Sequence, residues 1–139
     1  MFREMRRSKQ QMSEDAANAI LKSATSGVLS LLGDDGYPYG VPISYVYEEG
    51  KLYFHSALSG HKVDAVRNYD KASFTVIVQD DIVPEKYTTL YRSVIAFGCV
   101  HIPMMRLSAY MEYSFWQKNI IRENQKPGGA KKWLIAQTF

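Results

Sequence analysis

Five stretches of the chain alternate apolar and polar residues, and they follow one another at hairpin-like spacing. Each is rich in β-branched and aromatic residues, which suits a sheet strand with one buried face. The second contains two prolines, Pro38 and Pro42, which confine its first half to a sheet edge or an irregular segment because proline lacks the N–H that a ladder needs. The pattern predicts strands at residues 27–32, 37–47, 51–56, 72–78 and 91–102.

Turns and two helices separate these strands. Residues 34–36 (Asp-Asp-Gly) and 49–50 (Glu-Gly) are typical of hairpin turns, and residues 79–90 are predicted to form a loop. A serine followed by two acids can cap a helix over residues 13–22, because early acids suit the positive end of the helix dipole. A second helix is predicted to begin near Ser59, between the third and fourth strands.

This order of elements favours one domain of mainly β structure with flanking helices, built as a small antiparallel barrel. A chain of 139 residues can bury a core of its own. The sequence contains no G-x-G-x-x-G, P-loop, H-E-x-x-H or G-x-S-x-G motif, so it does not carry the usual signatures of dinucleotide binding, zinc proteolysis or serine hydrolysis.

Charge is distributed unevenly along the chain. Residues 1–102 carry 11 Lys and Arg against 12 Asp and Glu, whereas residues 103–139 carry 6 against 2. The net charge of +3 therefore belongs to the tail and does not make the domain basic. We expect no nucleic-acid partner.

Cys99 is the only cysteine, so neither an intrachain disulfide nor a cysteine-based zinc site is expected, and no metal site is predicted. Residues 1–11 are basic but lack the apolar core of a signal peptide. No run approaches the roughly 20 apolar residues of a membrane span. The sequence predicts a cytoplasmic protein without a membrane partner.

Residues 52–68, LYFHSALSGHKVDAVRN, place two basic side chains in the first turn of the second predicted helix. A cation there opposes the helix dipole by about 0.3 to 1 kcal/mol, whereas a bound anion is favoured. A phosphate held by the first-turn N–H groups, the hydroxyl of Ser56 or Ser59 and the Lys62 ammonium would explain the arrangement. The alternative is that His61 and Lys62 are solvated surface residues.

The spacing of several motifs carries a family resemblance. The succession DGYPYGVPISYVYEEGKLYFHSALSGHKVDAVRN, followed by YRSVIAFG, resembles the flavin-binding proteins related to pyridoxamine 5′-phosphate oxidase. It is most similar to their 5-nitroimidazole-reductase (Nim-type) branch. The resemblance extends from about Arg6 to Ile102 and includes the D-G-Y-P hairpin, a strand ending in F-H-S, and the quartet at residues 91–94.

The resemblance implies a six-stranded antiparallel split β-barrel, the FMN-binding split barrel. It also implies a homodimer with two FMN molecules in grooves between the subunits. The implied FMN-binding residues are Val41, Pro42, Ile43 and Ser44 along the ring, His55 and Ser56 beside the ring or ribityl chain, His61 and Lys62 at the phosphate, and Arg92 and Ser93 from the other subunit.

Some of these residues have simpler alternatives. Val41 and Ile43 can be ordinary core residues, and Arg92 can pair with Asp80 or Asp81. The family oxidases commonly have Arg-Lys where this chain has His-Lys at residues 61–62. Because an unperturbed histidine titrates near pH 6.5, we expect FMN affinity to weaken above about pH 7.

The implied function is that of an FMN-dependent oxidoreductase. It would reduce small nitroaromatic or similar acceptors with flavin that NAD(P)H has reduced. His55 is the candidate catalytic residue, because it can donate a proton near the predicted ring; the alternative is a structural hydrogen-bonding role.

Three other functions stay open. The first is a non-catalytic flavin- or haem-binding protein, and the second is a dimeric barrel with empty grooves. The third is pyridoxamine-phosphate oxidation. It is disfavoured because the sequence after the barrel does not resemble the C-terminus that supplies Arg and Trp in that oxidase.

The tail, residues 103–139, has no clear strand or helix period, and the resemblance stops before it. Translated back with permitted codons and read from the third base of each, the sequence from Pro103 onward can spell DDAAKRVYGIQLLAKKYYPGESE. That string begins with acids, carries I, L and L at helical spacing and ends in a Pro-Gly stop. We therefore predict a frameshift near Ile102, natural or introduced, and a tail that lacks the family's last helix and strand.

Reading the gene tests the frameshift. We expect a helix-like continuation of the family in a shifted frame directly after the codon for Ile102. A gene without such a continuation would rule the frameshift out and make the tail a selected part of the protein.

Overall fold

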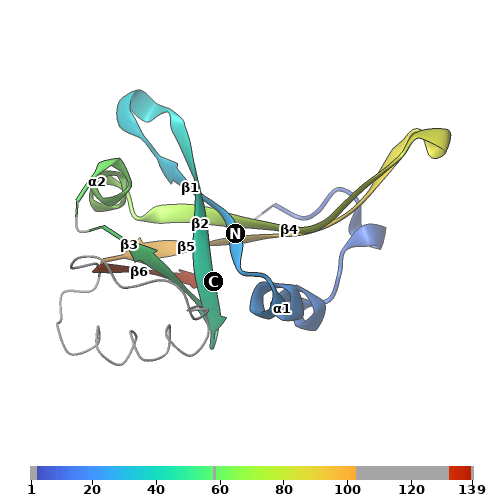
Figure 1. Ribbon diagram of the computed structural model, residues 1–139, viewed down its shortest axis with the longest axis horizontal. Helices are drawn as coiled ribbons and strands as arrows, with labels where there is room; N and C mark the ends of the chain where they lie inside the picture. The colour runs from blue at the N-terminus through green and yellow to red at the C-terminus, as the bar shows by residue number, and fades with distance from the viewer. Residues whose placement is uncertain (1–2, 58, 103–131, 139) are drawn as a thin grey trace, which may run out of the picture.

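The computed structural model describes residues 3–57, 59–102 and 132–138 (Figure 1). Two α-helices and six strands lie within these residues, joined by short 3-10 turns. In chain order the elements are η1 (Ser8–Gln10), α1 (Glu14–Ser23), β1 (Ser26–Leu32), η2 (Asp34–Gly36), β2 (Pro38–Glu48), β3 (Lys51–Ser56), α2 (His61–Asn68), β4 (Lys71–Val83), η3 (Pro84–Lys86), β5 (Thr88–His101) and β6 (Lys132–Thr138).

The described strands pair antiparallel in the order β1-β2-β3-β6-β5-β4, and β4 pairs with β1 to close a barrel. The predicted class, a mainly antiparallel β fold with flanking helices, is confirmed. Residues 38–44 pair with β1 on one side, while β3 pairs only with residues 45–48 of β2. The two prolines of β2 therefore lie where pairing with β3 is not required, as predicted.

The tail contributes a strand that the sequence pattern did not reveal. β6 pairs with β3 on one side and with β5 on the other. The expectation that the tail lacks a strand is therefore wrong, because a short run with aromatic and aliphatic residues (KWLIAQT) satisfies the ladder groups of two open strands. Residues 103–131 lie outside the described part of the chain, and the frameshift stays a prediction about the gene.

Strands β4 and β5 extend far beyond their predicted ends. The predicted loop at residues 79–90 is wrong, because most of it continues these strands, which pair as far as Val83 and Thr88. A register shift between Ile77 and Gln79 bends the hairpin. Figure 1 shows its yellow tip projecting at one end of the molecule, with α2 at the other end. We call residues 77–95 of this hairpin the arm.

Helix α1 forms where the capping pattern predicted it. The Ser13 hydroxyl accepts a hydrogen bond from the N–H of Ala16 at 3.2 Å, and Glu14 and Asp15 follow in the first turn. The helix buries Ile20 and Leu21 against the barrel. Neither helix in the described part of the chain has the length and apolarity needed to cross a bilayer.

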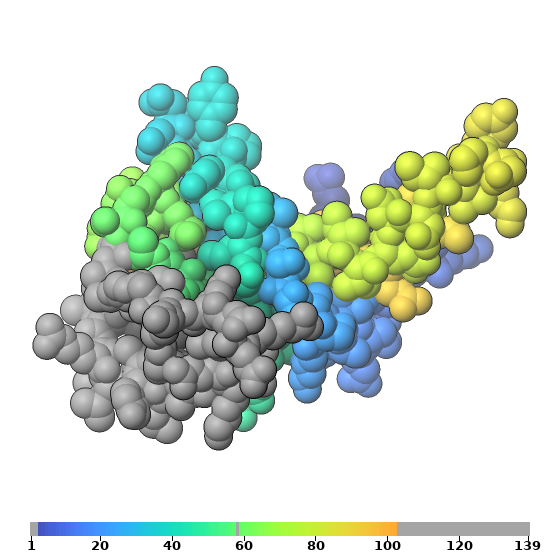
Figure 2. All heavy atoms as spheres, viewed as in Figure 1, coloured from blue at the N-terminus to red at the C-terminus, as the bar shows by residue number. Residues whose placement is uncertain are grey.

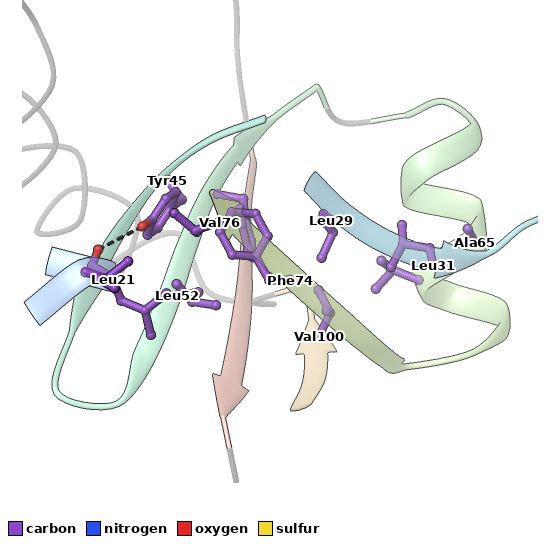
Figure 3. Close-up of a cluster of buried hydrophobic side chains, with 12 residues drawn as sticks. Leu21, Leu29, Leu31, Tyr45, Leu52, Ala65, Phe74, Val76 and Val100 are labelled. Atoms are coloured by element: carbon purple, nitrogen blue, oxygen red, sulfur yellow. Dashed lines mark hydrogen bonds between the residues drawn. The ribbon is translucent and has the colours of Figure 1, made fainter. Parts of the chain in front are cut away.

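The core is built around three aromatic side chains, Tyr45, Phe54 and Phe74, all at most 2% exposed. The ring of Phe74 lies 4.7 Å from that of Tyr45 and 5.1 Å from that of Phe54, in edge-on and tilted arrangements. The Tyr45 hydroxyl donates a buried 2.9 Å hydrogen bond to the carbonyl of Leu21 (Figure 3), so α1 is attached to β2 through the core.

Replacing Tyr45 with Phe should change how stability depends on alkaline pH. Burial raises the pKa of Tyr45 to about 12, whereas an unfolded tyrosine ionises near pH 10. The folded state thus holds its proton longer than the unfolded state, and stability falls as pH rises from about 10 to 12. Tyr45→Phe should lower the free energy of unfolding by about 1 kcal/mol near neutral pH, because the hydrogen bond is lost. Above pH 10, the free energy of unfolding of this variant should fall less steeply with pH than that of the unmodified protein.

Urea unfolding of both proteins across this range measures the difference. Tyr37→Phe is the matched control, since Tyr37 is 74% exposed. Parallel curves for Tyr45→Phe and the unmodified protein would contradict the prediction.

Candidate functional site

The last residue of β3 is a serine buried without a partner. Leu52, Phe54 and Ser56 alternate along β3 and face the barrel interior, and Ser56 is 5% exposed. Its Oγ makes no hydrogen bond with any described residue. Leaving a buried hydroxyl unsatisfied costs about 1 to 3 kcal/mol, so this position suits a group that supplies a hydrogen-bond partner.

Helix α2 begins five residues later, at His61, without a side-chain cap. Its N-cap is Gly60, with φ 117°, and not Ser59 as predicted, because only glycine adopts this backbone conformation without strain. The Gly60 carbonyl accepts hydrogen bonds from the N–H groups of Val63 and Asp64 at 2.9 and 3.1 Å. With no capping side chain, the N–H groups of His61 and Lys62, which precede these two, are the ones available to an acceptor such as a phosphate.

Lys62 lies in this first turn and is half-buried. Burial lowers the pKa of its ammonium group, because the charged form loses part of its hydration. A bound anion would restore a favourable environment for the charge. Ser56 ends β3 five residues before His61, so its orphaned hydroxyl, the uncapped turn and Lys62 are the groups of this segment whose chemistry fits a phosphate.

His61, the first residue of α2, is held by the β1–β2 hairpin. Its ring stacks on Tyr39 with centroids 4.1 Å apart and planes 16° apart. Its Nε2 lies 3.6 Å from Oδ2 of Asp34 in the hairpin turn. The sequence pattern predicts only a turn at Asp34 and no role for Tyr39, because no local pattern signals a contact between residues so far apart in the chain.

The predicted ring-lining segment of β2 has two different faces. Val41 and Ile43 are half-buried and pack against the core, which agrees with the alternative that they are core residues. Pro42 and Ser44 are exposed on the other face. Of this segment, the exposed face and the backbone are what a ligand outside the barrel can contact.

His55 precedes Ser56 on β3 and is half-buried. Successive strand residues point to opposite faces of a sheet, so His55 lies on the outer face of the barrel while Ser56 lies on the inner face. The two predicted ligands are therefore adjacent in sequence but approach a bound molecule from different directions.

Arg92 and Ser93 lie on the arm, away from the start of α2. Arg92 pairs with Gln79 of β4. Pairing of β5 with β6 begins only at Gly98, which lies about 20 Å of extended strand beyond Arg92. Ion pairs join His61 to Asp34 and Arg67 to Asp64, and among the described residues none joins Arg92 to Asp80 or Asp81. One chain alone does not bring Arg92 to the α2 site.

A separate hollow of about 510 Å³ lies between Arg7 and the tip of the arm, with Tyr87 and Tyr91 in its lining. None of the predicted site residues lines it. Within the described ranges, no three His, Cys, Asp or Glu side chains are grouped so that they could hold a metal ion.

Comparison with known families decides the affiliation of the chain. The family model described as pyridoxamine 5′-phosphate oxidase matches residues 13–108, well over half of the sequence. The chain belongs to the pyridoxamine 5′-phosphate oxidase family. The resemblance found in the sequence is thereby confirmed, and the matched residues include the β3–α2 segment and the whole arm.

Solved structures of similar fold extend the comparison. A protein from Bacteroides thetaiotaomicron named for 5-nitroimidazole antibiotic resistance has a TM-score of 0.77 and 17% identity, over 92% of this chain and 81% of its own. An FAD-binding protein from Mesorhizobium loti has a TM-score of 0.70 and 20% identity, over 92% and 91%. A flavocytochrome from Azotobacter vinelandii has a TM-score of 0.80 and 16% identity, over 97% and 68%. No curated protein matches the sequence of this chain.

Proposed function

We propose that this protein binds FMN where β3 ends and α2 begins, and that it works as an FMN-dependent oxidoreductase. It would reduce small aromatic acceptors, nitro compounds among them, with flavin that NAD(P)H has reduced. The observation that carries the proposal is the buried Ser56 hydroxyl without a partner, in the segment that leads directly into an uncapped helix with Lys62 in its first turn.

The phosphate of FMN is the group that this arrangement fits. Its oxygens can accept hydrogen bonds from the first N–H groups of α2, from the Ser56 hydroxyl and from the Lys62 ammonium. His61 is the second cation of the turn. A dianion at this end of the helix is also favoured by the helix dipole, which the basic side chains alone oppose.

The rest of the cofactor would lie along the outside of the barrel. We expect the exposed face of β2, with Pro42 and Ser44, and the backbone of Val41 and Ile43 to line the ring. Bound FMN supplies hydride acceptance from a nicotinamide and transfer of electrons singly or in pairs. His55, on the outer face of β3, would orient the acceptor or donate a proton to it.

The choice of a flavin is supported by what proteins of similar fold are named for binding. Similar structures include an FAD-binding protein and a flavocytochrome, and another is a haem-binding protein from Mycobacterium smegmatis. The single set of phosphate donors at the start of α2 favours FMN, which carries one phosphate, over FAD, which carries two. The single cysteine supports a cytoplasmic location.

We further propose that two copies form the split-barrel dimer and complete the site. Directly opposed strand residues share a face, so Ile77, Ser93 and Ile95 lie together on the outer face of β4 and β5. The two isoleucines are 64% and 57% exposed, and Tyr91 nearby is 55% exposed. Figure 2 shows the arm projecting from the body of the molecule, where a second copy can cover it. Such exposed apolar patches mark interaction sites, and this one would bring Arg92 and Ser93 to a partner's flavin.

Anaerobic mixing of the FMN-loaded protein with NADH or NADPH tests the catalytic part of the proposal. Loss of the yellow flavin absorbance, and its recovery on adding a nitroaromatic compound, is the expected result. A flavin that binds but is not bleached would make the protein a flavin carrier. A red protein with haem absorbance, or one that gains no colour with FMN, would overturn the flavin assignment.

A further inference from the structure

The contact between the β1–β2 hairpin and the start of α2 has a chemistry that the proposed function does not use. Asp34 and Tyr39 both reach the same imidazole, that of His61, from the hairpin. Figure 2 shows the atoms of α2 lying against this hairpin. The tip of the hairpin is exposed, and this contact joins it to the start of the helix.

We propose that Asp34 and Tyr39 are positioning residues that make the cofactor phosphate bind through a protonated His61. This inference rests on the proposed FMN site. Tyr39 fixes the plane of the imidazole by stacking, and the Asp34 carboxylate, 3.6 Å from Nε2, favours the ring orientation that turns Nε2 toward it. Nδ1 is then the ring nitrogen left to face another group.

The protonation state of the ring decides what Nδ1 can do. In a neutral imidazole that donates Nε2–H toward Asp34, Nδ1 is a hydrogen-bond acceptor and cannot bind a phosphate oxygen. In the imidazolium form both nitrogens donate, and one positive charge lies between two anions, the carboxylate and the phosphate. Deprotonation of His61 removes that charge and leaves the two anions facing each other.

The surroundings of His61 contain few other charges. Among the described residues, the groups that contact it from the hairpin are Asp34 and Tyr39. On its own helix the neighbouring charges are Lys62 and Asp64, and Asp64 already pairs with Arg67 at 3.3 Å. Asp34 is therefore the nearby anion that would repel the FMN phosphate once His61 loses its positive charge.

The test is the dissociation constant of FMN between about pH 6 and 8.5, with riboflavin as the ligand that lacks the phosphate. From about pH 6 to 8.5, the FMN affinity of the unmodified protein should fall about 3- to 10-fold more than that of His61→Arg, which keeps a fixed cation. In Asp34→Asn, this fall in affinity should be at least twofold smaller than in the unmodified protein. Tyr39→Leu should also flatten the profile, and Tyr39→Phe, which keeps the stack, should restore it. Riboflavin binding should show none of these differences.

Each outcome bears on a distinct claim. If FMN binds and the unmodified protein, Asp34→Asn and His61→Arg share one pH profile, the positioning role is overturned and the proposed function stands. If FMN does not bind the unmodified protein at any pH, both fall. Asp34 is 81% exposed, so Asp34→Asn should keep the melting temperature of the unmodified protein, and this separates a change in the site from a change in folding.

Discussion

Replacing Lys62 with Ala should weaken FMN binding by about 5- to 150-fold. This corresponds to about 1 to 3 kcal/mol, the range for a charge-assisted hydrogen bond to a phosphate. Lys62 is half-buried, and burial already lowers the pKa of its ammonium group. A charge in such a place interacts more strongly with a bound anion than a fully hydrated lysine does. Titration calorimetry with FMN measures the change directly.

The matched control is Lys71→Ala, which removes the same charge from an exposed position at the start of β4. It should leave FMN affinity unchanged within about twofold. Riboflavin affinity should not change in Lys62→Ala, because riboflavin has no phosphate. Equal losses for FMN and riboflavin would mean that the substitution disturbs the ring site or the fold, and unchanged FMN affinity would remove Lys62 from the site.

Two aspartates on the outer face of the arm should convert a dimer to a monomer. Ile77→Asp combined with Ile95→Asp places two carboxylates in a patch that we propose a second copy covers. Truncating a hot-spot residue of an interface costs about 2 kcal/mol or more, and we expect both isoleucines to be hot spots. The pair should therefore weaken dimerisation by about 1,000-fold. Light scattering should change from about twice the chain mass of 15.9 kDa to that mass itself.

The same variant should lose FMN affinity, because Arg92 and Ser93 can reach a flavin only on the partner if the proposed arrangement is correct. Tyr37→Asp combined with Tyr69→Asp is the control, since these side chains are 74% and 44% exposed and lie outside the arm. It should stay dimeric and bind FMN normally. An unmodified protein that is monomeric but still binds FMN would refute the shared site while leaving the α2 phosphate site intact.

Local patterns in the sequence were sufficient for most of the fold. The cap at Ser13, the hairpin turn at 34–36 and the alternation along β1 to β3 each act over a few residues, and the structure has these elements where they were predicted. The ends of β4 and β5 were not predictable in this way. Residues 79–90 contain acids, a proline and threonines, and they form strands because each pairs with the other across the arm.

For the candidate site as well, the features that could be predicted from the sequence are the local ones. The basic pair at 61–62 and the serine at 56 could be selected from sequence, because the helix start and its charge are local features. Their surroundings could not: that Ser56 is buried without a partner, and that Asp34 and Tyr39 hold His61, depends on how the barrel closes. The β6 strand could not be predicted from local sequence, because its seven residues form a strand by pairing with two neighbouring strands, β3 and β5.

Binding of FMN compared with riboflavin is the most direct test of the central claim, that a phosphate sits where β3 meets α2. We expect the flavin-free protein to bind FMN at least tenfold more tightly than riboflavin, and this advantage to shrink at least fivefold in Lys62→Ala. Equal affinities for the two ligands in the unmodified protein, or no binding of either, would contradict the account.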